Sequence, residues 1–567
     1  MKRIIFSLLS LELVFAACSK DDITTVSDTT SGATSGGSSE PDTNVTADYD
    51  RTVAIVFSSS GAATVSGTGD NLSATISGND VTIRNSGDEK VMYNLSGSTT
   101  DGFLKIYSGR KQGITLNSVS ITNSRGAAIN VQGLEETPNK GKRVDLVVNG
   151  SSTLADGTTY ILTPDSEDEK AVVFSEGQIV VSGNGTLTVN ATGKAGVTSD
   201  DWLQFLAGPT VKVTASAGNG VRGKDYIIVS GGTLDISVSA NGKKGMSSDS
   251  LVRFDGGQTT IKMSGNTVVE SGDTNRSNGV KADQLFEMNA GSLTITNSGT
   301  GGKGISCDGK GYFRGGIVDI TVTGNNFGST SGGGHGPGGG GHGPGGGSSS
   351  DNSVGAKGIK CDGDIEISGG IISVKASKHE GIETKGTLTV TGGEVYSQSS
   401  DDAINSASTM TISGGMVCAY STGNDGLDAN GNLYIQGGMV YAIGTSNPEV
   451  AIDANTEGGY KLYVQGGTII AIGSLENGAQ LSQACYQASS WTKNAWYSIT
   501  VDGNTYAFKT PASGGTKLVV SGAERPTVKK SVTAEGGTSR FNGMLLEGPE
   551  VSGGTEVTLS NYSSGGW

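Results

Sequence analysis

Acidic residues recur in pairs along the C-terminal half of this 567-residue sequence. One member of each pair directly precedes a short phrase that starts with Gly or Ala, and the other lies inside that phrase. The pairs and their continuation are Glu380/Glu383, Asp402/Asn405, Asp425/Asp428 and, after Val450, Asp453. Carboxylate and amide oxygens suit Ca²⁺ better than a transition metal. The pattern therefore predicts a Ca²⁺ site, and a solvated acidic face without a metal is the alternative.

Earlier copies of the phrase carry a different set of charges. Basic residues stand at Arg222, Lys281 and Lys360, and carboxylates follow in the same phrases at Asp283, Asp308 and Asp362. This mixture suits an acidic sugar, with Ca²⁺ bridging its carboxylate. A lysine with a depressed pKa is also a suitable base for an eliminating lyase, which makes Lys281 and Lys360 candidates. A ladder of Lys and Asp that merely neutralises each turn is the alternative.

These charged positions belong to a repeat of Gly, an apolar residue, any residue, a small residue and Asp or Asn. Most copies are 22 to 25 residues apart, and they begin at positions 196, 220, 245, 279, 304, 358, 381, 403, 426 and 451. A fixed period in this range is typical of solenoid proteins. Between the copies, apolar and polar residues alternate, as in Asp364–Lys375, and this alternation predicts strands. The repeat therefore predicts a parallel β-helix.

Stacked turns would align equivalent residues into columns. The apolar residue after each start is expected to face inward; these are Val197, Val221, Met246, Val280, Ile305, Ile359, Ile382, Ile404, Leu427 and Ile452. A column of small residues two positions later is also expected to face inward, whereas the residue between them is expected to face solvent. Gly-Gly pairs such as Gly369-Gly370 are expected at the bends, where positive φ suits glycine.

The period divides the chain into parts. Residues 51–125 carry irregular alternating strands and are predicted to form an N-terminal β cap and the first irregular turns. Residues 126–475 are predicted to form the β-helix, with a Gly-rich loop at 324–353, and residues 476–567 a small C-terminal β appendage. Cys307 and Cys361 fall in the same small-residue column. We expect two buried thiols there rather than a disulfide, because stacked strands hold Cβ atoms farther apart than a relaxed disulfide needs.

The N-terminus predicts export. Residues 1–17 read as a lipoprotein signal peptide with an apolar stretch too short to span a membrane, and Ala16-Ala17-Cys18 makes Cys18 the expected lipidation site. Residues 18–50 are predicted to be a flexible tether. We expect a lipoprotein on the outer membrane, at the cell surface. The net charge of −15 argues against nucleic acid as a partner.

Several stretches together resemble a known family. They include Asn117–Ile129, Ala171–Ser175, Gly183–Val189 and the phrase Lys357–Asp362 with a Gly-rich insertion before it. They are similar to the calcium-containing, carbohydrate-binding parallel β-helix family of secreted bacterial proteins and Bacteroidetes lipoproteins. The resemblance covers roughly residues 110–475. It implies a pectate-lyase-like fold, Ca²⁺, and binding of acidic plant-type polysaccharide or cellulose without established catalysis.

Taken together, the residues and the resemblance predict a right-handed parallel β-helix that binds polysaccharide with Ca²⁺ and does not catalyse a reaction. A polysaccharide lyase acting on uronates and a structural adhesin stalk are the alternatives. The sequence contains no Gly-x-Ser-x-Gly elbow, phosphate-binding Walker loop or Cys-x-x-Cys pair, and nothing singles out a pair of acids for glycoside hydrolysis.

Overall fold

The structure, a computed structural model, describes residues 49–134, 143–161, 164, 167–328, 354–446 and 448–564. The predicted signal peptide, Cys18, most of the predicted tether and residues 329–353 of the Gly-rich loop lie outside the described residues. Among the described residues, no helix has both the length and the apolar character that a membrane span needs.

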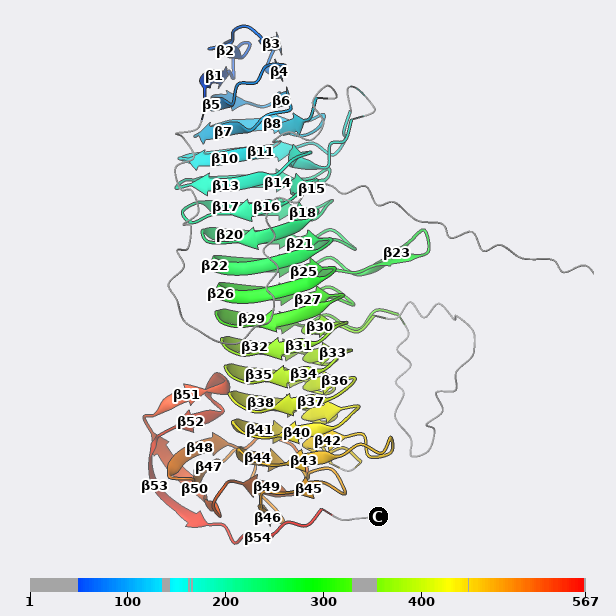
Figure 1. Cartoon of the computed structure of the whole chain (residues 1–567), viewed down its shortest axis with the longest axis vertical. Coiled ribbons are helices and arrows are strands. Elements are labelled where there is room, and N and C mark those ends of the chain that lie inside the picture. The colour runs from blue at the N-terminus through cyan, green and yellow to red at the C-terminus, as the bar shows by residue number, and fades with distance from the viewer. Residues whose placement is uncertain are drawn as a thin grey trace, which may run out of the picture. The chain divides into compact units, whose positions relative to one another are not determined.

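The described part of the chain is almost entirely β-structure. It forms sheets of 31, 15, six and two strands, and its one helical segment is the 3₁₀ turn Phe541–Gly543. In the two largest sheets most neighbouring strands are parallel and are about one repeat apart in the sequence (Figure 1). The predictions of an all-β protein and of parallel strands are confirmed.

The 15-stranded sheet receives one strand from each turn of the repeat. Its strands, in spatial order, are β3 (Leu72–Ser77), β4 (Asp80–Asn85), β6 (Phe103–Ser108), β9 (Ile129–Gln132), β12 (Ala171–Ser175), β15 (Ala195–Ser199), β18 (Val221–Gly223), β21 (Lys244–Ser248), β25 (Asn278–Ala282), β27 (Lys303–Cys307), β30 (Ile359–Cys361), β33 (Ile382–Thr384), β36 (Ile404–Ser406), β39 (Leu427–Ala429) and β42 (Ile452–Ala454). Each repeat phrase lies on one of these strands, so this sheet carries the candidate functional residues.

The 31-stranded sheet contains the other two strands of each turn. One series is β1 (Arg51–Phe57), β5 (Val91–Thr99), β7 (Gln112–Asn117), β10 (Val144–Asn149), β13 (Ile179–Gly183), β16 (Leu203–Phe205), β19 (Tyr226–Val229), β22 (Leu251–Met263), β26 (Leu285–Asn297), β28 (Lys310–Phe313), β31 (Ile365–Ile367), β34 (Leu388–Val390), β37 (Met410–Ile412), β40 (Leu433–Ile435), β43 (Leu462–Val464) and β45 (Gln480–Leu481).

The second series follows it along the chain. It comprises β8 (Ser120–Asn123), β11 (Ser151–Asp156), β14 (Thr186–Ala191), β17 (Thr210–Ala215), β20 (Thr233–Val238), β29 (Ile317–Val322), β32 (Ile371–Ala376), β35 (Glu394–Ser399), β38 (Met416–Ser421), β41 (Met439–Ile443) and β44 (Thr468–Ile472). The long strands β22 and β26 run through both series, because each pairs with two successive strands of the neighbouring turn.

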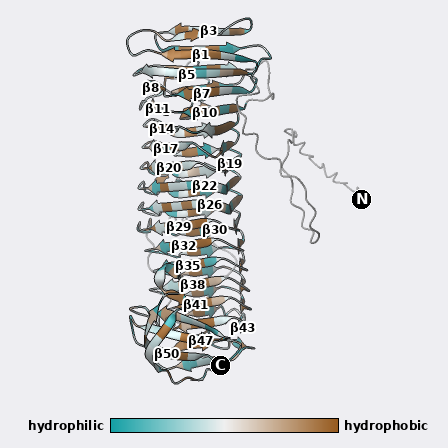
Figure 2. Cartoon of the chain, turned by 90° about the vertical axis from the view of Figure 1, so that its left-hand side faces the viewer, coloured by the Kyte–Doolittle hydropathy of each residue, from teal (hydrophilic) through white to brown (hydrophobic). Residues whose placement is uncertain are grey.

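The core lies between these sheets, and Figure 2 shows hydrophobic segments recurring along successive strands. Every residue of the predicted apolar column is at most 1% exposed, so this prediction is confirmed. Phe254, Phe286 and Phe313 fill the middle of the core, with ring centroids 6.0 and 5.3 Å apart. One turn cannot bury such residues alone, and stacking on its neighbours buries them.

Glycines shape the bends as predicted. In the Gly-Gly pairs at the bends of the repeat, the second glycine has a φ between 72° and 84°; these are Gly232, Gly257, Gly316, Gly370, Gly393, Gly415, Gly438 and Gly467. At Gly370 an added Cβ would also lie 2.8 Å from the backbone of Gly315 on the preceding turn. Both the left-handed conformation and the close approach of the turns therefore favour glycine.

The two ends depart from simple stacking. Parallel pairing already begins at β1 with β5, so stacked turns start N-terminal to residue 126, and antiparallel pairing is confined there to β2 (Thr64–Ser66) and to β3 with β4. At the other end, β44 pairs antiparallel with β49 (Leu518–Ser521). The remaining strands of the largest sheet are β46 (Cys485–Ala488) and β54 (Ser560–Asn561).

The residues after β46 supply a separate antiparallel sheet of six strands. These are β47 (Trp496–Val501), β48 (Asn504–Lys509), β50 (Thr527–Glu535), β51 (Thr538–Arg540), β52 (Leu545–Glu547) and β53 (Glu550–Glu556). Arg540 Nη1 lies 3.1 Å from Glu394 Oε2 of β35, which ties this sheet to the stacked turns. The two-stranded sheet is a hairpin of β23 (Val268–Glu270) and β24 (Asp273–Asn275).

The four cysteines within the described residues, Cys307, Cys361, Cys418 and Cys485, are free thiols. Cys307 and Cys361 are register partners on β27 and β30, and both are fully buried free thiols. The expectation of two buried thiols in this column is confirmed. Phe327, near the start of the predicted Gly-rich loop, and Val354, directly after the loop, pair through an antiparallel bridge.

Candidate functional site

Two columns of side chains run along the outer face of the 15-stranded sheet. The first outward column holds the residue before each repeat start: Ala195, Asn219, Lys244, Asn278, Lys303, Lys357, Glu380, Asp402, Asp425 and Val450. The second outward column holds the residue two positions after the start: Thr198, Arg222, Ser247, Lys281, Ser306, Lys360, Glu383, Asn405, Asp428 and Asp453. Adjacent strands lie about 4.8 Å apart, so neighbours within a column are close.

The two outward columns face the same side and touch each other. Asn405 Nδ2, in the second column, donates to Asp402 Oδ2 of the first column at 3.2 Å and also to Asp428 Oδ2 on the next turn. The predicted metal-ligating residues on and just before β36 and β39 are therefore brought together: Asp402, Asn405, Asp425 and Asp428.

Contrary to the sequence prediction, the second outward column is not generally exposed to solvent. Glu383 is only 1% exposed, Ser306 5% and Asn405 7%. At Glu383 the cause is visible, because the long side chains of Lys357 and Lys385 reach over its carboxylate. Side-chain cover of this kind depends on contacts between turns, which alternation within one strand does not reveal.

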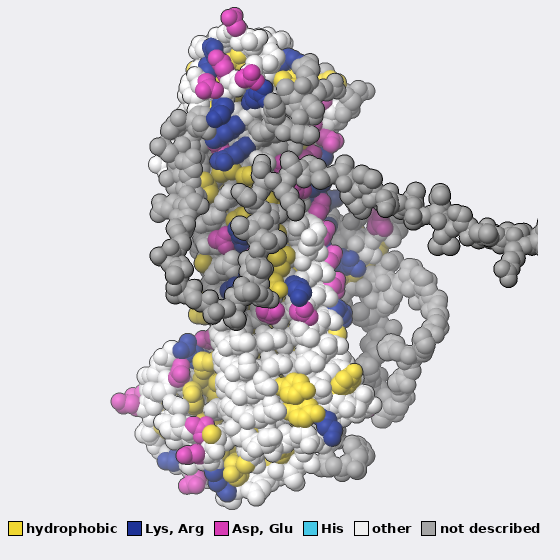
Figure 3. Space-filling model, in the orientation of Figure 1, with side chains coloured by type: hydrophobic (Ala, Val, Ile, Leu, Met, Phe, Trp, Pro, Cys, Tyr) yellow, Lys and Arg dark blue, Asp and Glu magenta, His cyan; other side chains and the backbone are white. Residues whose placement is uncertain are grey.

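The charge of both outward columns reverses along the stack. The turns from β18 to β30, which we call the basic half, supply Arg222, Lys244, Lys281, Lys303 and Lys360. The turns from β33 to β42, which we call the acidic half, supply carboxylates. Lys357 stands at the boundary, with its Nζ 2.5 Å from Glu383 Oε2 and 3.2 Å from Glu380 Oε2. Figure 3 shows charged side chains along the edge of the stack that bears the 15-stranded sheet.

In the basic half, the predicted ligand-binding residues form ion pairs. Arg222 Nη2 lies 2.8 Å from Asp249, and Lys281 Nζ lies 2.7 Å from both Asp283 and Asp308. Lys360 pairs with Asp362. The Nζ atoms of Lys281 and Lys360, the candidate bases for a lyase, thus both lie against carboxylates.

Lys303 is a basic residue that the sequence pattern did not single out. It is only 4% exposed, and among the described residues no carboxylate lies within ion-pair distance of its Nζ. Burial, reinforced by Arg276 and Lys357, lowers the pKa of Lys303 to about 7. Lys303 could have been recognised in the sequence from its position directly before a repeat start, which it shares with Glu380, Asp402 and Asp425.

The acidic half contains carboxyl groups that have little contact with solvent and form no ion pair with a basic side chain. Asp402 and Asp425 are each 7% exposed. Asp402 Oδ1 accepts the backbone N–H of Asp425 at 3.3 Å, and Asp425 Oδ1 accepts that of Val450. Within the described ranges, no Lys or Arg forms an ion pair with Asp402, Asp425, Asp428 or Asp453. An isolated buried carboxylate is costly, and such groups are usually paired, protonated or bound to a metal.

The pKa values show how this cost is relieved without a cation. Burial, followed by repulsion from Asp428 and Asp425, raises the pKa of Asp402 well above its usual range. Burial, with Glu449 and Asp428, raises the pKa of Asp425 to about 8, and burial raises that of Asp428 to about 6. Burial and a hydrogen bond with Glu476 raise the pKa of Asp453 to about 11. Several of these groups therefore hold protons at neutral pH.

Glu380 and Glu383 have a different environment. Burial favours the neutral form of Glu383, but Lys357 and Lys385 outweigh it and lower its pKa to about 2. Glu380 lies beside His379, whose Nδ1 is also 3.1 Å from Asp401 Oδ2. Burial disfavours the charged form of His379, but Asp401 and Glu380 outweigh it and raise its pKa to about 9.

The donor set of the acidic half fits Ca²⁺. Asp402, Asn405, Asp425 and Asp428 offer oxygen atoms from two successive strands, and Ca²⁺ accepts six to eight oxygen ligands in flexible geometry. A second group, His379, Glu380 and Asp401, has ligand atoms within 4.8 Å of one another. Its imidazole and its contact with Lys357 make it less suited to Ca²⁺ than the four residues of β36 and β39.

The raised pKa values predict that the metal-free protein loses stability as pH rises from about 5 to 9. In this window the folded state keeps protons on Asp425, Asp428 and His379 that the unfolded chain releases, so the free energy of unfolding falls. Glu383 and Lys303 act in the opposite direction. Glu383 does so only as pH falls below about 4.5, the usual pKa of a glutamate. Lys303 does so above about pH 7, where the unfolded chain keeps a proton that the folded state has lost, but Asp425 and His379 together outweigh this one group. The thermal midpoint in a chelator should therefore fall by a few degrees.

Differential scanning fluorimetry across this pH range tests the prediction. Added Ca²⁺ should flatten the slope, because metal binding displaces the protons. A midpoint in chelator that stays constant or rises with pH would show that these carboxyl groups are not buried in the protonated form.

Comparison with known proteins identifies the family. Residues 77–403, more than half of the chain, match the family described as carbohydrate-binding domain-containing protein. The chain belongs to this carbohydrate-binding domain family. The matched range contains the basic half, Glu380, Glu383 and Asp402, and it ends before Asp425 and Asp428.

Two similar proteins can be named alongside the family. A carbohydrate-binding domain-containing protein of Acetivibrio thermocellus is 30% identical over 121 residues, which cover 21% of this chain and 40% of that protein. The chain thus matches less than half the length of that relative. A solved structure described as the polysaccharide lyase-like protein from C. thermocellum, gadolinium derivative, is 24% identical; the match covers 48% of this chain and 97% of that one, with a TM-score of 0.36.

Proposed function

We propose that this member of the carbohydrate-binding domain family binds an acidic, uronate-containing polysaccharide of plant type, with Ca²⁺ and without catalysis. The binding surface is the outer face of the 15-stranded sheet, and the stacked turns form a right-handed parallel β-helix. The protein is displayed as an outer-membrane lipoprotein at the cell surface, anchored through Cys18. The family match supports the carbohydrate ligand, and the N-terminal sequence supports the anchor.

The observation that carries this proposal is a set of carboxyl groups without basic partners, of which Asp402 and Asp425 are buried and Asp428 is half-buried. Their unfavourable burial is relieved when Ca²⁺ replaces the protons. The ion is held by Asp402, Asn405, Asp425 and Asp428. Asp453 offers a further carboxylate on the next turn. Ca²⁺ takes six to eight ligands, so coordination positions remain for the carboxylate of a uronate.

The basic half adds a second mode of recognition for the same polymer. Arg222, Lys281 and Lys360 stand on turns about 4.8 Å apart or at small multiples of that spacing. Glycan carboxylates lying along the sheet can exchange with Asp249, Asp283, Asp308 and Asp362 as partners of these cations. Because the basic and acidic halves are continuous, one polysaccharide chain can contact both cations of the protein and bound Ca²⁺.

One observation favours β-elimination as a second candidate function. Lys303 has a pKa lowered to about 7, which suits a general base at neutral pH, whereas Lys281 and Lys360 are paired with carboxylates. In such a reaction the lysine amine takes the proton from C5 of the uronate, a C4=C5 double bond forms, and the bond from C4 to the glycosidic oxygen breaks. That oxygen leaves with the bonding electron pair and takes a proton from water, which releases the other sugar fragment with a free hydroxyl group.

Chromatography on immobilised polygalacturonate tests the proposal. We expect the protein to be retained with Ca²⁺ and released by a chelator, and soluble polygalacturonate incubated with it should gain no absorbance from unsaturated products. Rising absorbance that is lost in Lys303→Met would establish the lyase instead. Absence of retention under both conditions would contradict glycan binding by this face and favour a structural stalk.

A further inference from the structure

A cavity of about 290 Å³ opens near the N-terminal end of the same sheet face. Its floor is formed by β4, β6 and β9, where Thr82, Lys105 and Asn130 are register partners. Phe174 and Thr198 continue this line into the second outward column. Lys105 and Asn405 are ten strand steps apart, which corresponds to on the order of 50 Å. The cavity is therefore separate from the acidic half.

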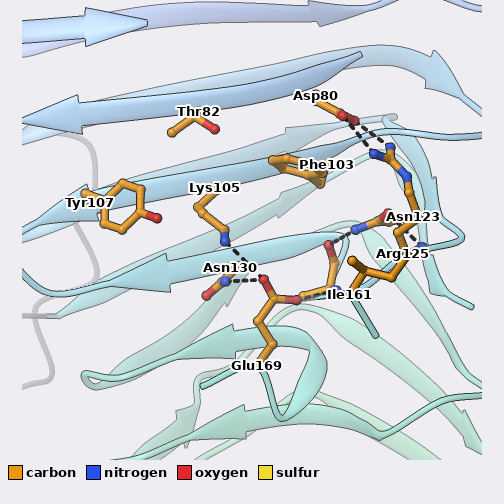
Figure 4. A pocket seen from close by; sticks show the side chains of 11 residues that line it. Asp80, Thr82, Phe103, Lys105, Tyr107, Asn123, Arg125, Asn130, Ile161 and Glu169 are labelled. Atoms are coloured by element: carbon orange, nitrogen blue, oxygen red, sulfur yellow. Dashed lines mark hydrogen bonds and ion pairs between the residues drawn. The ribbon is translucent and has the colours of Figure 1, made fainter. Parts of the chain in front are cut away.

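The polar groups of the cavity are held in fixed positions. Lys105 Nζ lies 2.9 Å from Glu167 Oε2 and 3.2 Å from Glu169 Oε1, and Asn130 Nδ2 donates to Glu169 Oε1 at 2.7 Å. Lys105, Asn130 and Glu169 are each at most 6% exposed. Figure 4 shows these side chains converging below Phe103. Their buried hydrogen bonds hold donors and acceptors ready for a ligand, which reduces the ordering cost of binding.

Both cations around the cavity are paired with carboxylates, and the carboxylates outnumber the cations. Arg125 forms two parallel hydrogen bonds with Asp80, of 2.9 and 2.8 Å, and Lys105 is matched by Glu169 and Glu167. Neither cation is left for an anionic ligand, since each is already paired with carboxylates. A buried anionic group on a ligand would have no counterion and would lie near Glu167 and Glu169, so the lining favours a polar molecule without negative charge.

Apolar surface borders the polar floor. The ring of Phe103 is half-buried, with the guanidinium of Arg125 6.0 Å from its centroid. Ile161 stands at the rim with 63% of its surface exposed, and its backbone N–H donates to the carbonyl of Arg125 at 2.7 Å. Apolar walls combined with a few fixed polar groups are typical of small-molecule sites. A pyranose ring offers both a C–H face and surrounding hydroxyl groups.

We propose that this cavity binds one residue of a neutral hexopyranose, independently of Ca²⁺. The C–H face of the sugar lies against Phe103 and Ile161, and its hydroxyl groups hydrogen-bond to Lys105, Asn130 and Glu169. The cavity lies within the range that matches the carbohydrate-binding domain family. The inference rests on the proposed function only in that the ligand is a carbohydrate. The location of the site, the neutral charge of the sugar and the independence of binding from Ca²⁺ are separate claims.

Isothermal titration calorimetry of the full chain with cellotriose, mannotriose and maltotriose, in a chelator, tests this site. We expect at least one trisaccharide to bind, and Phe103→Ala to weaken that binding about ten-fold or more, which corresponds to about 1.4 kcal/mol. Ile161→Asp should have a similar effect, and because Ile161 is exposed it leaves the fold intact. Tyr312→Ala is the matched control, since Tyr312 also lies under an arginine, Arg314, at 4.4 Å.

The outcomes separate this site from the acidic half. Asp402→Asn/Asp428→Asn should bind the neutral trisaccharide as the wild type does, even if polygalacturonate binding is lost or never existed. Absence of binding of all three sugars to the wild type would overturn the inference. So would unchanged affinity in both Phe103→Ala and Ile161→Asp, whatever the result with polygalacturonate.

Discussion

Replacing Asp402 and Asp428 with asparagine is expected to lower the affinity for Ca²⁺ at least ten-fold and to abolish Ca²⁺-dependent retention on polygalacturonate. Changing even an outer partner of a metal ligand typically costs ten- to a hundred-fold in affinity, and here two charged ligands are removed. Asparagine keeps the size of the side chain and an oxygen that can accept the hydrogen bonds of Asn405. The fold should therefore be preserved.

The same double variant has a second expected property that a merely damaged protein would lack. It should be more stable than the wild type in a chelator at pH 8, because two acids with raised pKa values are gone. Asp283→Asn is the control, since Asp283 lies in the basic half and pairs with Lys281. Calorimetric Ca²⁺ titrations that coincide for the wild type and the double variant would place the ion elsewhere.

Phe286→Ala is expected to cause the largest loss of stability. Phe286 is fully buried and lies between Phe254 and Phe313, which belong to the turns on either side. Truncating a buried phenylalanine typically costs about 3–5 kcal/mol, because apolar contact is lost and a cavity remains. Here the cavity would open between three stacked turns, each of which depends on its neighbours for burial.

Urea unfolding followed by circular dichroism measures this effect. The midpoint for Phe286→Ala should fall clearly below that of the wild type. Ile317→Ala is the control: Ile317 is 51% exposed, so its truncation should change stability by no more than about 0.5 kcal/mol. Equal midpoints for Phe286→Ala and Ile317→Ala would contradict the core described here.

The parts of the structure that repeat are those that the sequence predicted well. Ile305, Ile359 and Ile382 recur at one position of the phrase, and each is buried because alternation within a strand fixes which side chains point inward. The bends were equally predictable, since Gly370 and its equivalents combine positive φ with close approach of the previous turn.

Features that arise from contacts between turns were harder to predict from the sequence. The burial of Glu383 depends on Lys357 and Lys385 reaching across neighbouring positions. Lys303 was not predicted as a site residue, because the first outward column, to which it belongs, carries acidic residues only on the later turns. The cavity combines Phe103, Arg125 and Glu169, which are far apart in sequence and come from the N-terminal turns, where the period is irregular. In each case three-dimensional proximity, rather than a motif, creates the chemistry.

Crystals of the full chain soaked with Ca²⁺ and a galacturonate oligosaccharide provide the most direct test of the central claim. We expect an ion bound between the carboxylates of Asp402, Asp425 and Asp428, with a carboxylate of the sugar among its remaining ligands. An acidic half that stays free of metal at saturating Ca²⁺, or a sugar bound at a surface away from the 15-stranded sheet, would contradict it.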